Sequence, residues 1–375
     1  MYGVALRITP PQLRAVAAQL FVELLQGGYT QVCEFHYLQH QPDGRAYDDP
    51  ATLSLALADA ADDAGIGLTL LPVLYERAGF SEPALREQQR RFATTPASVH
   101  ALCRTLNAAQ RPRLNAGVAI HSLRAASAEA IQELLRRVGA EDLPLHIHVA
   151  EQTLEVDACI AATGLRPIEW LTRHAALDSR WQLVHATHAG AAEIESVARS
   201  GAGIVICRST EANLGDGLPD LPGWLDAAVP IALGSDSQVT RNWPEELRWL
   251  EYGQRLALRR RNVGAAPLAG EPSTAARLFN LALEAGARAA GQARWGLERA
   301  GVAYREERHA PGFHALAVRR AGGVRGTPAL VTSDGVIGDS TDILLWANER
   351  AAKGRELYPV DADARAEVLA LEDRF

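Results

Sequence analysis

Two hydrophobic patterns alternate from about residue 11 to 240. Apolar residues at three-and-four spacing, as in the stretch that begins at Pro11 and stops at Gly27 and Gly28, predict amphipathic helices. Between such stretches lie short, nearly continuous aliphatic runs, which are typical of strands buried on both faces of a parallel sheet. Seven runs of this kind are predicted as strands: 30–37, 68–76, 113–121, 143–151, 181–188, 203–210 and 228–237.

The repeated strand–helix units predict an α/β fold, and we favour a (β/α)8 TIM barrel over an open sheet. The first run is not followed by the glycine-rich motif of a dinucleotide-binding fold. Polar side chains stand at or just beyond the ends of most predicted strands. They are His36, His121, His148, Glu151, His185, Thr210 and Asp236. Since the carboxyl ends of barrel strands carry the active site, we expect a site there.

Composition narrows the function classes. The 375 residues are 47% hydrophobic and 22% charged, as in ordinary globular proteins. The formal net charge of −7 argues against a nucleic-acid or acidic-membrane partner. The four cysteines are widely spaced, which favours a reducing cytoplasm over a disulfide framework or a cysteine zinc site. We therefore expect a cytoplasmic protein without a signal peptide or membrane span.

Three strand ends supply the strongest candidate chemistry. His146 and His148 in the segment HIHVAEQ share one face of a strand, and Glu151 follows three residues later. His185 lies at the end of the next strand, and Asp236 directly follows the last one. Neutral imidazoles bind zinc and a nearby carboxylate can shuttle protons, so the set predicts a metal-dependent hydrolase. Taken singly, His146 is better interpreted as a hydrogen-bonded structural residue, and Asp236 as an N-cap or Asx-turn residue.

Other residues and segments give weaker indications of function. Arg124 follows the strand-end His121, and its guanidinium fork suits a carboxylate, although a solvated surface arginine is equally compatible. Tyr37 either hydrogen-bonds a substrate or caps the barrel rim. Residues 209–220 are predicted to form a polar, glycine-rich loop over the active face, and 245–262 to form an amphipathic helix.

Seven motifs in about the first 290 residues together resemble the formimidoylglutamate deiminases of the amidohydrolase superfamily. The motifs are EFHYLQHQPDG (34–44), HVAEQ (148–152), RPIEWL (166–171), LVHATH (183–188), STEANLGDG (209–217), GSDSQV (234–239) and EELRWLEYGQRLALRRRN (245–262). The resemblance implies a (β/α)8 barrel, one Zn2+ per chain, and hydrolysis of N-formimidoyl-L-glutamate to N-formyl-L-glutamate and ammonia in histidine degradation.

The resemblance also implies a role for each candidate residue. His148 would be a zinc ligand, and Asp236 a second ligand that accepts a proton from the metal-bound water. Glu151 would carry protons to the formimidoyl nitrogen, and His185 would position or polarise the group at the reacting carbon. The residues that would hold the glutamate portion of the substrate are Tyr37, His121 and Arg124.

Two features depart from the family pattern. The family has an HxH pair of metal ligands at the end of its first barrel strand, and this sequence has no such segment before the strand at 30–37. We therefore expect a barrel that lacks its first strand, has unpaired edges beside the gap and binds zinc with severely reduced affinity. The second departure is Arg208-Ser209, where the resemblance leads us to expect Pro-Thr.

Residues 291–375 resemble part of the N-terminal, thioredoxin-like domain of glutathione S-transferases. Thr327-Pro328 looks like the turn before a strand, with a cis proline, and Asp339-Ser340 looks like the pair that binds the γ-glutamyl end of glutathione. The alternative is that these residues describe only a hairpin and a capped helix. The expected domains are thus an amidohydrolase barrel over 1–290 and a partial thioredoxin-like segment over 291–375.

The sequence is compatible with three functions. The first is a deiminase in which the barrel carries the activity. The second is a catalytically dead truncated or fused product with at most weak glutathione binding, and the third is another aminohydrolase that acts on a purine or pterin. We expect a small-molecule substrate and no nucleic-acid or membrane partner. A homodimer is also compatible with the sequence.

Overall fold

A computed structural model describes residues 2–291, 302, 330–333, 335–337, 340–353 and 356–366. The chain divides into two compact units, Met1–Ala290 and Gly291–Phe375. Each unit is described by itself, and the first contains all the strand ends that the sequence singles out.

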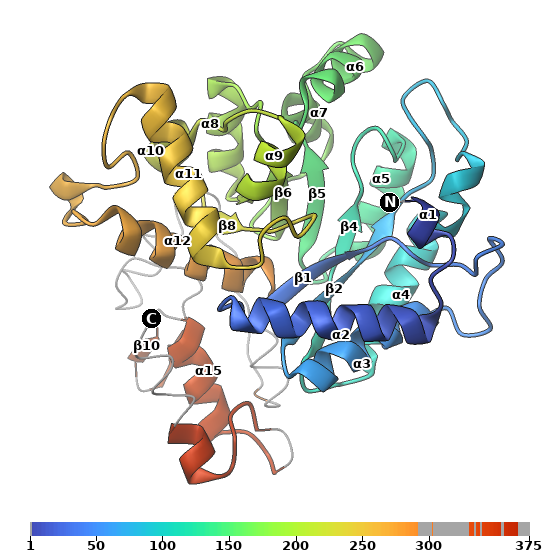
Figure 1. The fold of residues 1–375 in the computed structure, drawn as a ribbon, viewed down its shortest axis with the longest axis horizontal. Helices are drawn as coiled ribbons and strands as arrows, with labels where there is room; N and C mark the ends of the chain where they lie inside the picture. The colour runs from blue at the N-terminus through green and yellow to red at the C-terminus, as the bar shows by residue number, and fades with distance from the viewer. Residues whose placement is uncertain are drawn as a thin grey trace. The chain divides into compact units, whose positions relative to one another are not determined.

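A curled parallel sheet forms the centre of the first unit (Figure 1). Its strands are β1 (Gln31–His36), β2 (Gly67–Leu74), β3 (Leu114–Ala116), β4 (Val118–Ile120), β5 (Leu145–Val149), β6 (Trp181–His185), β7 (Gly203–Ile206) and β8 (Ile231–Leu233). The order is β1-β2-β4-β5-β6-β7-β8, and β3 also pairs with β2. Every one of these pairs is parallel.

The strands β3 and β4 occupy one position in the sheet and are separated by Gly117. A Cβ atom at Gly117 would lie 2.4 Å from the carbonyl oxygen of Pro144, so only glycine lets the two backbones approach. Seven strand positions result among the described residues, as the sequence predicts. Since β1 and β8 are not paired with each other there, the α/β fold is an incomplete TIM barrel, and the predicted fold class is confirmed.

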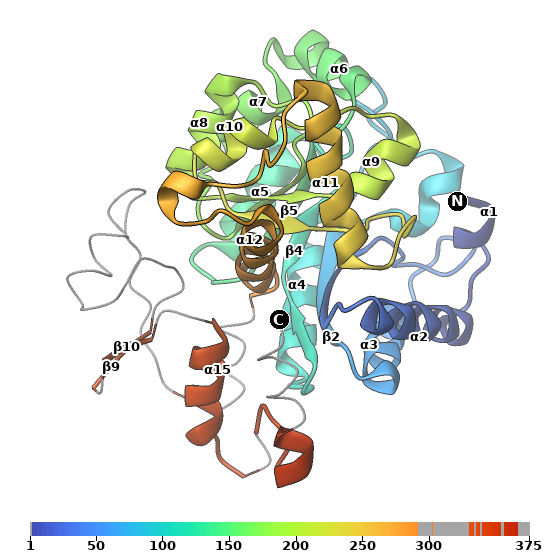
Figure 2. The ribbon, with the colours of Figure 1, turned by 60° about the vertical axis from the view of Figure 1, so that its left-hand side comes forward.

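Helices surround the sheet, and all but α12 lie outside the half-barrel. They are α1 (Tyr2–Ala5), α2 (Pro10–Gln26), α3 (Thr52–Ala64), α4 (Pro96–Ala108), α5 (Ala128–Val138), α6 (Thr153–Thr163), α7 (Pro167–His174), α8 (Ala191–Ser200), α9 (Arg208–Leu214), α10 (Leu221–Asp226), α11 (Trp243–Leu258) and α12 (Thr274–Ala289). Figures 1 and 2 show α2 and α3 side by side next to β1 and β2. Phe21 of α2, Leu57 of α3 and Leu68 of β2 belong to one buried cluster, and burial of such side chains drives the packing.

The helix α12 reaches into the interior of the half-barrel. Ala285 and Ala289 pack in one cluster with Val184 of β6, Val205 of β7 and Ala232 of β8. Small side chains on this face of α12 let the helix approach the strands closely, and α12 lies beside β8 in Figures 1 and 2. The helix thereby covers part of the apolar interior beside the unpaired edge.

Hydrogen bonds hold the carboxyl end of α12 near the beginnings of three strands. His146 Nε2 donates to the carbonyl oxygen of Ala289 over 2.9 Å. Asn115 Nδ2 donates to the carbonyl oxygen of Ala290 over 2.7 Å, and Thr69 Oγ1 lies 3.0 Å from the same oxygen. These bonds satisfy carbonyl groups that the last turn of a helix leaves without a partner.

The prediction of a loop over 209–220 is wrong in its first half, which forms α9. Its polar residues are buried partners of other elements, and their polarity does not indicate exposure to solvent. Ser209 Oγ donates to Glu246 of α11 over 2.5 Å, and Thr210 Oγ1 donates to the carbonyl oxygen of Ser235 over 3.0 Å. Residues 215–220 lie outside any helix.

The second unit contains an antiparallel pair of strands, β9 (Leu330–Thr332) and β10 (Gly335–Ile337), and the helix α15 (Ser340–Glu349). Ile343 and Ala347 of α15 form its small buried cluster. Of the residues predicted to bind glutathione, Thr327, Pro328 and Asp339 lie outside the described residues, and Ser340 is described only in its backbone at the start of α15. Across the part of the chain that the structure describes, no helix is long and apolar enough to cross a bilayer.

Candidate active site

Four residues predicted from the sequence meet at the carboxyl ends of β5, β6 and β8. His185 Nε2 lies 3.8 Å from Glu151 Oε1 and 3.9 Å from Asp236 Oδ2. The rings of His148 and His185 stack with centroids 5.6 Å apart. Two imidazoles and two carboxylates from three strand ends therefore form one cluster, as expected for the active face of a barrel.

The ring of His148 is fixed by its backbone surroundings. Its Nδ1 donates to the carbonyl oxygen of His121 over 2.9 Å, and the ring of Phe35 lies 4.1 Å away between centroids. Burial, with smaller effects from His121 and His185, lowers the pKa of His148 well below its usual value. Because a carbonyl oxygen only accepts, the neutral ring keeps its proton on Nδ1 and leaves the Nε2 lone pair available.

The backbone at this cluster is strained. Ala150, His185, Ala186 and Asp236 have φ angles of 53°, 70°, 49° and 46°, in a region that residues other than glycine rarely adopt. The Glu155 carboxylate accepts the backbone N–H groups of Ala150 and Glu151, over 3.1 and 2.9 Å. At the end of β5, the turn that aims Glu151 at His185 is therefore held by a neighbouring buried side chain.

The cluster is arranged for proton transfer. Burial raises the pKa of both Glu151 and Asp236, although the nearby His185 opposes this shift. Burial also acts against a charged His185, but the hydrogen bond with Glu211 and the charges of Glu151 and Asp236 outweigh it and raise the pKa of His185. Carboxyl groups with raised pKa values can act as general acids nearer neutral pH than ordinary ones.

The residues expected to hold the glutamate portion lie on the β1 and β4 side of this cluster. The rings of Tyr37 and His121 are 5.6 Å apart between centroids, and those of His121 and His148 are 5.5 Å apart. Burial raises the pKa of the Tyr37 hydroxyl, with a further effect from Asp236. Burial, followed by the charge of Arg124, lowers the pKa of His121 to about 3. The Arg124 side chain is exposed.

His146 stands apart from the cluster. It shares a strand with His148, but its Nε2 donates to the end of α12. The hydrogen-bonded structural interpretation of this residue is therefore the one that the geometry supports.

Two buried residues of the site were not predicted from the sequence to be site residues. Glu211 of α9 is 0% exposed; its Oε1 lies 3.3 Å from His185 Nδ1 and accepts the backbone N–H of Cys207 over 2.9 Å. Arg208, 3% exposed, donates from Nη1 to Glu211 Oε2 over 2.6 Å. The sequence feature that could have identified Glu211 is its spacing, since Glu211 follows the end of β7 by about one helical turn, inside the STEANLGDG motif.

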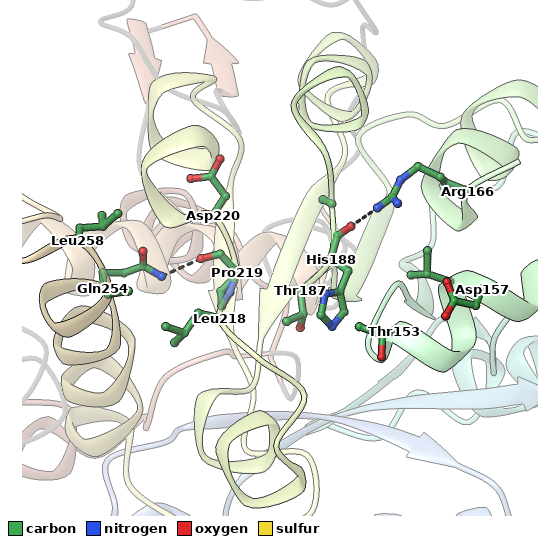
Figure 3. Close-up of a pocket in the computed structure, with 13 residues that line it drawn as sticks. Thr153, Asp157, Arg166, Thr187, His188, Leu218, Pro219, Asp220, Gln254 and Leu258 are labelled. Carbon is green, nitrogen blue, oxygen red and sulfur yellow. Dashed lines mark hydrogen bonds between the residues drawn. The ribbon is translucent and has the colours of Figure 1, made fainter. Parts of the chain in front are cut away.

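A pocket of about 580 Å³ lies next to the cluster, beyond the end of β6 (Figure 3). Its lining residues are Thr153, Val156, Asp157, Arg166, Thr187, His188, Ala189, Leu218, Pro219, Asp220, Gln254, Ala257 and Leu258. Arg166 donates to the carbonyl oxygen of His188, and Gln254 Nε2 donates to that of Pro219 over 2.7 Å. The pocket lining includes Thr187, His188 and Ala189, which follow β6, but it contains none of the four clustered residues.

The donors present do not by themselves fit a zinc ion. Within the described ranges, no three His, Cys, Asp or Glu side chains are grouped so that they could hold a metal. His148 offers Nε2 and Asp236 a carboxylate, whereas a catalytic zinc takes three protein ligands.

Comparison with known proteins identifies the family. The profile described as "Amidohydrolase family" matches residues 4–294, and "Glutathione S-transferase, N-terminal domain" matches 286–355. Formimidoylglutamate deiminase of Pseudomonas aeruginosa is 48% identical over 293 residues, which are 78% of this chain and 64% of that protein. A 5-methylthioadenosine/S-adenosylhomocysteine deaminase of Natronomonas pharaonis is 27% identical over 246 residues, which are 64% of this chain and 51% of that protein.

Solved structures agree with this assignment. An amidohydrolase from Brucella melitensis superposes with a TM-score of 0.74 at 44% identity, covering 78% of this chain and 64% of that one. Atrazine chlorohydrolase from Arthrobacter aurescens, complexed with zinc, has a TM-score of 0.62 at 22% identity over 75% of this chain and 60% of its own, and shares the fold. The chain spans less than two thirds of the length of these relatives. It belongs to the amidohydrolase family.

Proposed function

We propose that the cluster of Glu151, His185 and Asp236 hydrolyses N-formimidoyl-L-glutamate to N-formyl-L-glutamate and ammonia. The observation that carries the proposal is the position of His185 Nε2 within 4 Å of two carboxylates whose pKa values burial raises. The 48% identity to a formimidoylglutamate deiminase supports the choice of substrate.

The substrate chemistry fits this arrangement. A formimidoyl group is an amidine, which is a planar cation near neutral pH, and the carboxylate of Asp236, which acts as the base, attracts such a cation. Water adds to the formimidoyl carbon as Asp236 accepts a proton from it. The bond from carbon to the terminal nitrogen then breaks as Glu151 gives that nitrogen a proton and ammonia leaves, and the hydroxyl on carbon returns a proton to Glu151 as the C=O bond forms. The remaining group is a formamide, so the atoms of substrate and water are all accounted for.

The other residues would bind and orient the substrate. His185 would hold the reacting group between Glu151 and Asp236. Tyr37 and His121 would contact the glutamate portion, and Arg124 would pair with a carboxylate of the substrate at the rim of the site.

Zinc hydrolases use a bound zinc ion to activate the attacking water. His148 and Asp236 are the donors that the described residues offer to it. One zinc per chain would require further ligands in addition to these two, so metal content has to be measured separately from activity.

The test is ammonia release from N-formimidoyl-L-glutamate by the full chain, with and without added zinc, together with metal analysis of the same sample. We expect ammonia and N-formyl-L-glutamate in equal amounts, and no ammonia from 5-methylthioadenosine. Absence of ammonia from formimidoylglutamate under both conditions would overturn the proposal.

Glutathione binding by the second unit is a separate proposal, supported by the match of residues 286–355 to a glutathione S-transferase domain. The residues that would contact glutathione are Thr327, Pro328, Asp339 and Ser340. Isothermal titration calorimetry of the full chain with glutathione tests it, and a signal equal to that of buffer would remove it.

A further inference from the structure

The two ring nitrogens of His185 face different groups. Nε2 faces the carboxylates of Glu151 and Asp236 in the cluster, whereas Nδ1 contacts the buried Glu211. Which nitrogen carries the proton decides whether Nε2 presents a lone pair or an N–H to the site.

We propose that the buried pair of Glu211 and Arg208 is the positioning unit of His185. Glu211 accepts the proton on Nδ1 and so keeps the Nε2 lone pair turned toward the reacting group. The consequence for catalysis rests on the proposed function, but the effect on the tautomer of the ring does not.

Glu211 is anchored on three sides. Its Oε1 takes the backbone N–H of Cys207 over 2.9 Å in addition to His185 Nδ1, and its Oε2 takes Arg208 Nη1 over 2.6 Å. The backbone N–H and the guanidinium can only donate, so an ionised carboxylate satisfies both, and it leaves His185 Nδ1 to donate in the third contact. A carboxylate has no proton to give to Nδ1, and this is why the contact selects one tautomer.

Arg208 makes the buried charge of Glu211 tolerable. Burying one ion without a partner costs several kcal/mol, and the close contact with Arg208 compensates that charge. Arg208 Nη1 also donates to the carbonyl oxygen of Gly217 over 3.0 Å. The pair therefore links the end of β7 to the segment after α9, and both parts hold Glu211 in place.

The variant Glu211→Gln separates positioning from packing. The amide is nearly the same shape, but it has a single acceptor oxygen. Because a charge-assisted bond is the stronger one, we expect this oxygen to face Arg208, which turns the NH2 group toward His185. Nδ1 must then accept, and the proton of the ring moves to Nε2.

Glu246→Gln is the matched control. Glu246 is also 0% exposed, and it accepts the backbone N–H and the hydroxyl of Ser209 over 3.0 and 2.5 Å. It anchors the same helix α9 without a hydrogen bond to His185. A purely structural effect of losing a buried carboxylate would appear in both variants.

The readout is the 15N NMR spectrum of the histidine side chains in the full chain, recorded at alkaline pH and assigned with His185→Gln. We expect the Nδ1–H tautomer of His185 in the unaltered protein and with Glu246→Gln, and the Nε2–H tautomer with Glu211→Gln. An Nε2–H tautomer in the unaltered protein would overturn the proposal even if no variant folds.

Turnover gives a second, separable result. We expect Glu211→Gln to lower kcat about 10- to 100-fold with KM changed less than about threefold, since it alters a group that orients another. If the tautomer reverses but no chain releases ammonia, the proposed function fails and the positioning role stands. If ammonia is released and Glu211→Gln changes neither the tautomer nor kcat, the positioning role fails alone.

Discussion

At the scale of single residues, the site depends on carboxyl groups held in surroundings that favour their protonated form. Glu151 is the clearest case, because its raised pKa comes first from burial and persists against the opposing charge of His185. Its position is set by the backbone bonds to Glu155. Side-chain chemistry and local backbone geometry therefore act together at this residue.

The variant Glu151→Gln should lose the proposed acid step. We expect kcat for ammonia release to fall by about 10²- to 10⁴-fold, because an amide cannot deliver the proton to the leaving nitrogen. Circular dichroism should be unchanged. Asp157→Asn in the adjacent pocket is the control and should retain activity within about twofold. Equal activity of Glu151→Gln and the unaltered chain would refute the assigned role.

His36 should make the protein sensitive to acid. It is 3% exposed, and burial lowers its pKa to about 4, below the usual 6.5. The unfolded chain therefore binds a proton first as the pH falls. The contribution of the neutral His36 to the free energy of unfolding is therefore complete above pH 6.5. It is lost as the pH falls toward 4, by up to about 3 kcal/mol. Urea unfolding at several pH values should show a steeper loss for the unaltered chain than for His36→Gln, and parallel curves would contradict this.

Residues at strand ends could be predicted from the sequence, and partners of those residues could not. His148, Glu151, His185 and Asp236 each follow a recognisable aliphatic run, and parallel strands bring such ends to one edge. Glu211 lies inside a polar motif whose burial depends on contacts with α11 and His185. Contacts between elements distant in sequence leave no periodic signal in a single chain.

At the scale of elements, the seven strand positions follow from the aliphatic runs, because a strand buried on both faces leaves its own pattern. The position of α12 does not follow. Its alanines are compatible with any close packing, and the sequence alone does not indicate that Ala285 and Ala289 face the interior of the half-barrel. The prediction of a loop over 209–220 is wrong in the part that forms α9 for a related reason, because it assumes that polar residues face solvent.

Asn115 should contribute to stability by holding the end of α12. Its Nδ2 donates to Ala290 and its Oδ1 accepts from Thr69 Oγ1 over 2.7 Å. Asn115→Ala leaves these groups short of a partner, and we expect a loss of about 1–3 kcal/mol in the free energy of unfolding, measured in urea. Arg14→Ala is the control, because Arg14 and Asp63 form an exposed pair, which solvent screens so that it contributes little to stability. Equal losses would show that α12 is not held in this way.

At the scale of the whole molecule, each unit has its own buried cluster. We expect two calorimetric transitions, the lower one from the smaller unit, since small domains bury less of their surface. Ile343→Ala should lower only that transition, and Phe21→Ala only the upper one, each by the equivalent of about 2–5 kcal/mol. A single transition shifted by both variants would contradict two independent units.

Among the described residues, one side of β1 has no strand partner, and this bears on how the protein behaves in concentrated solution. Exposed strand edges tend to pair with other chains, and charged residues along them oppose this. Within β1 the charge comes from Glu34, whose pKa is raised to about 7 by burial and by Asp236. The edge therefore loses its charge below neutrality.

Light scattering should show self-association that increases as the pH falls from 8 to 6. Glu34→Gln should already associate at pH 8, because its edge is uncharged at every pH. If the unaltered chain and this variant scatter alike at pH 8, Glu34 does not protect the edge. If Glu34 does protect the edge, mild acidification would remove soluble protein by assembly before most of the stability that depends on His36 is lost toward pH 4.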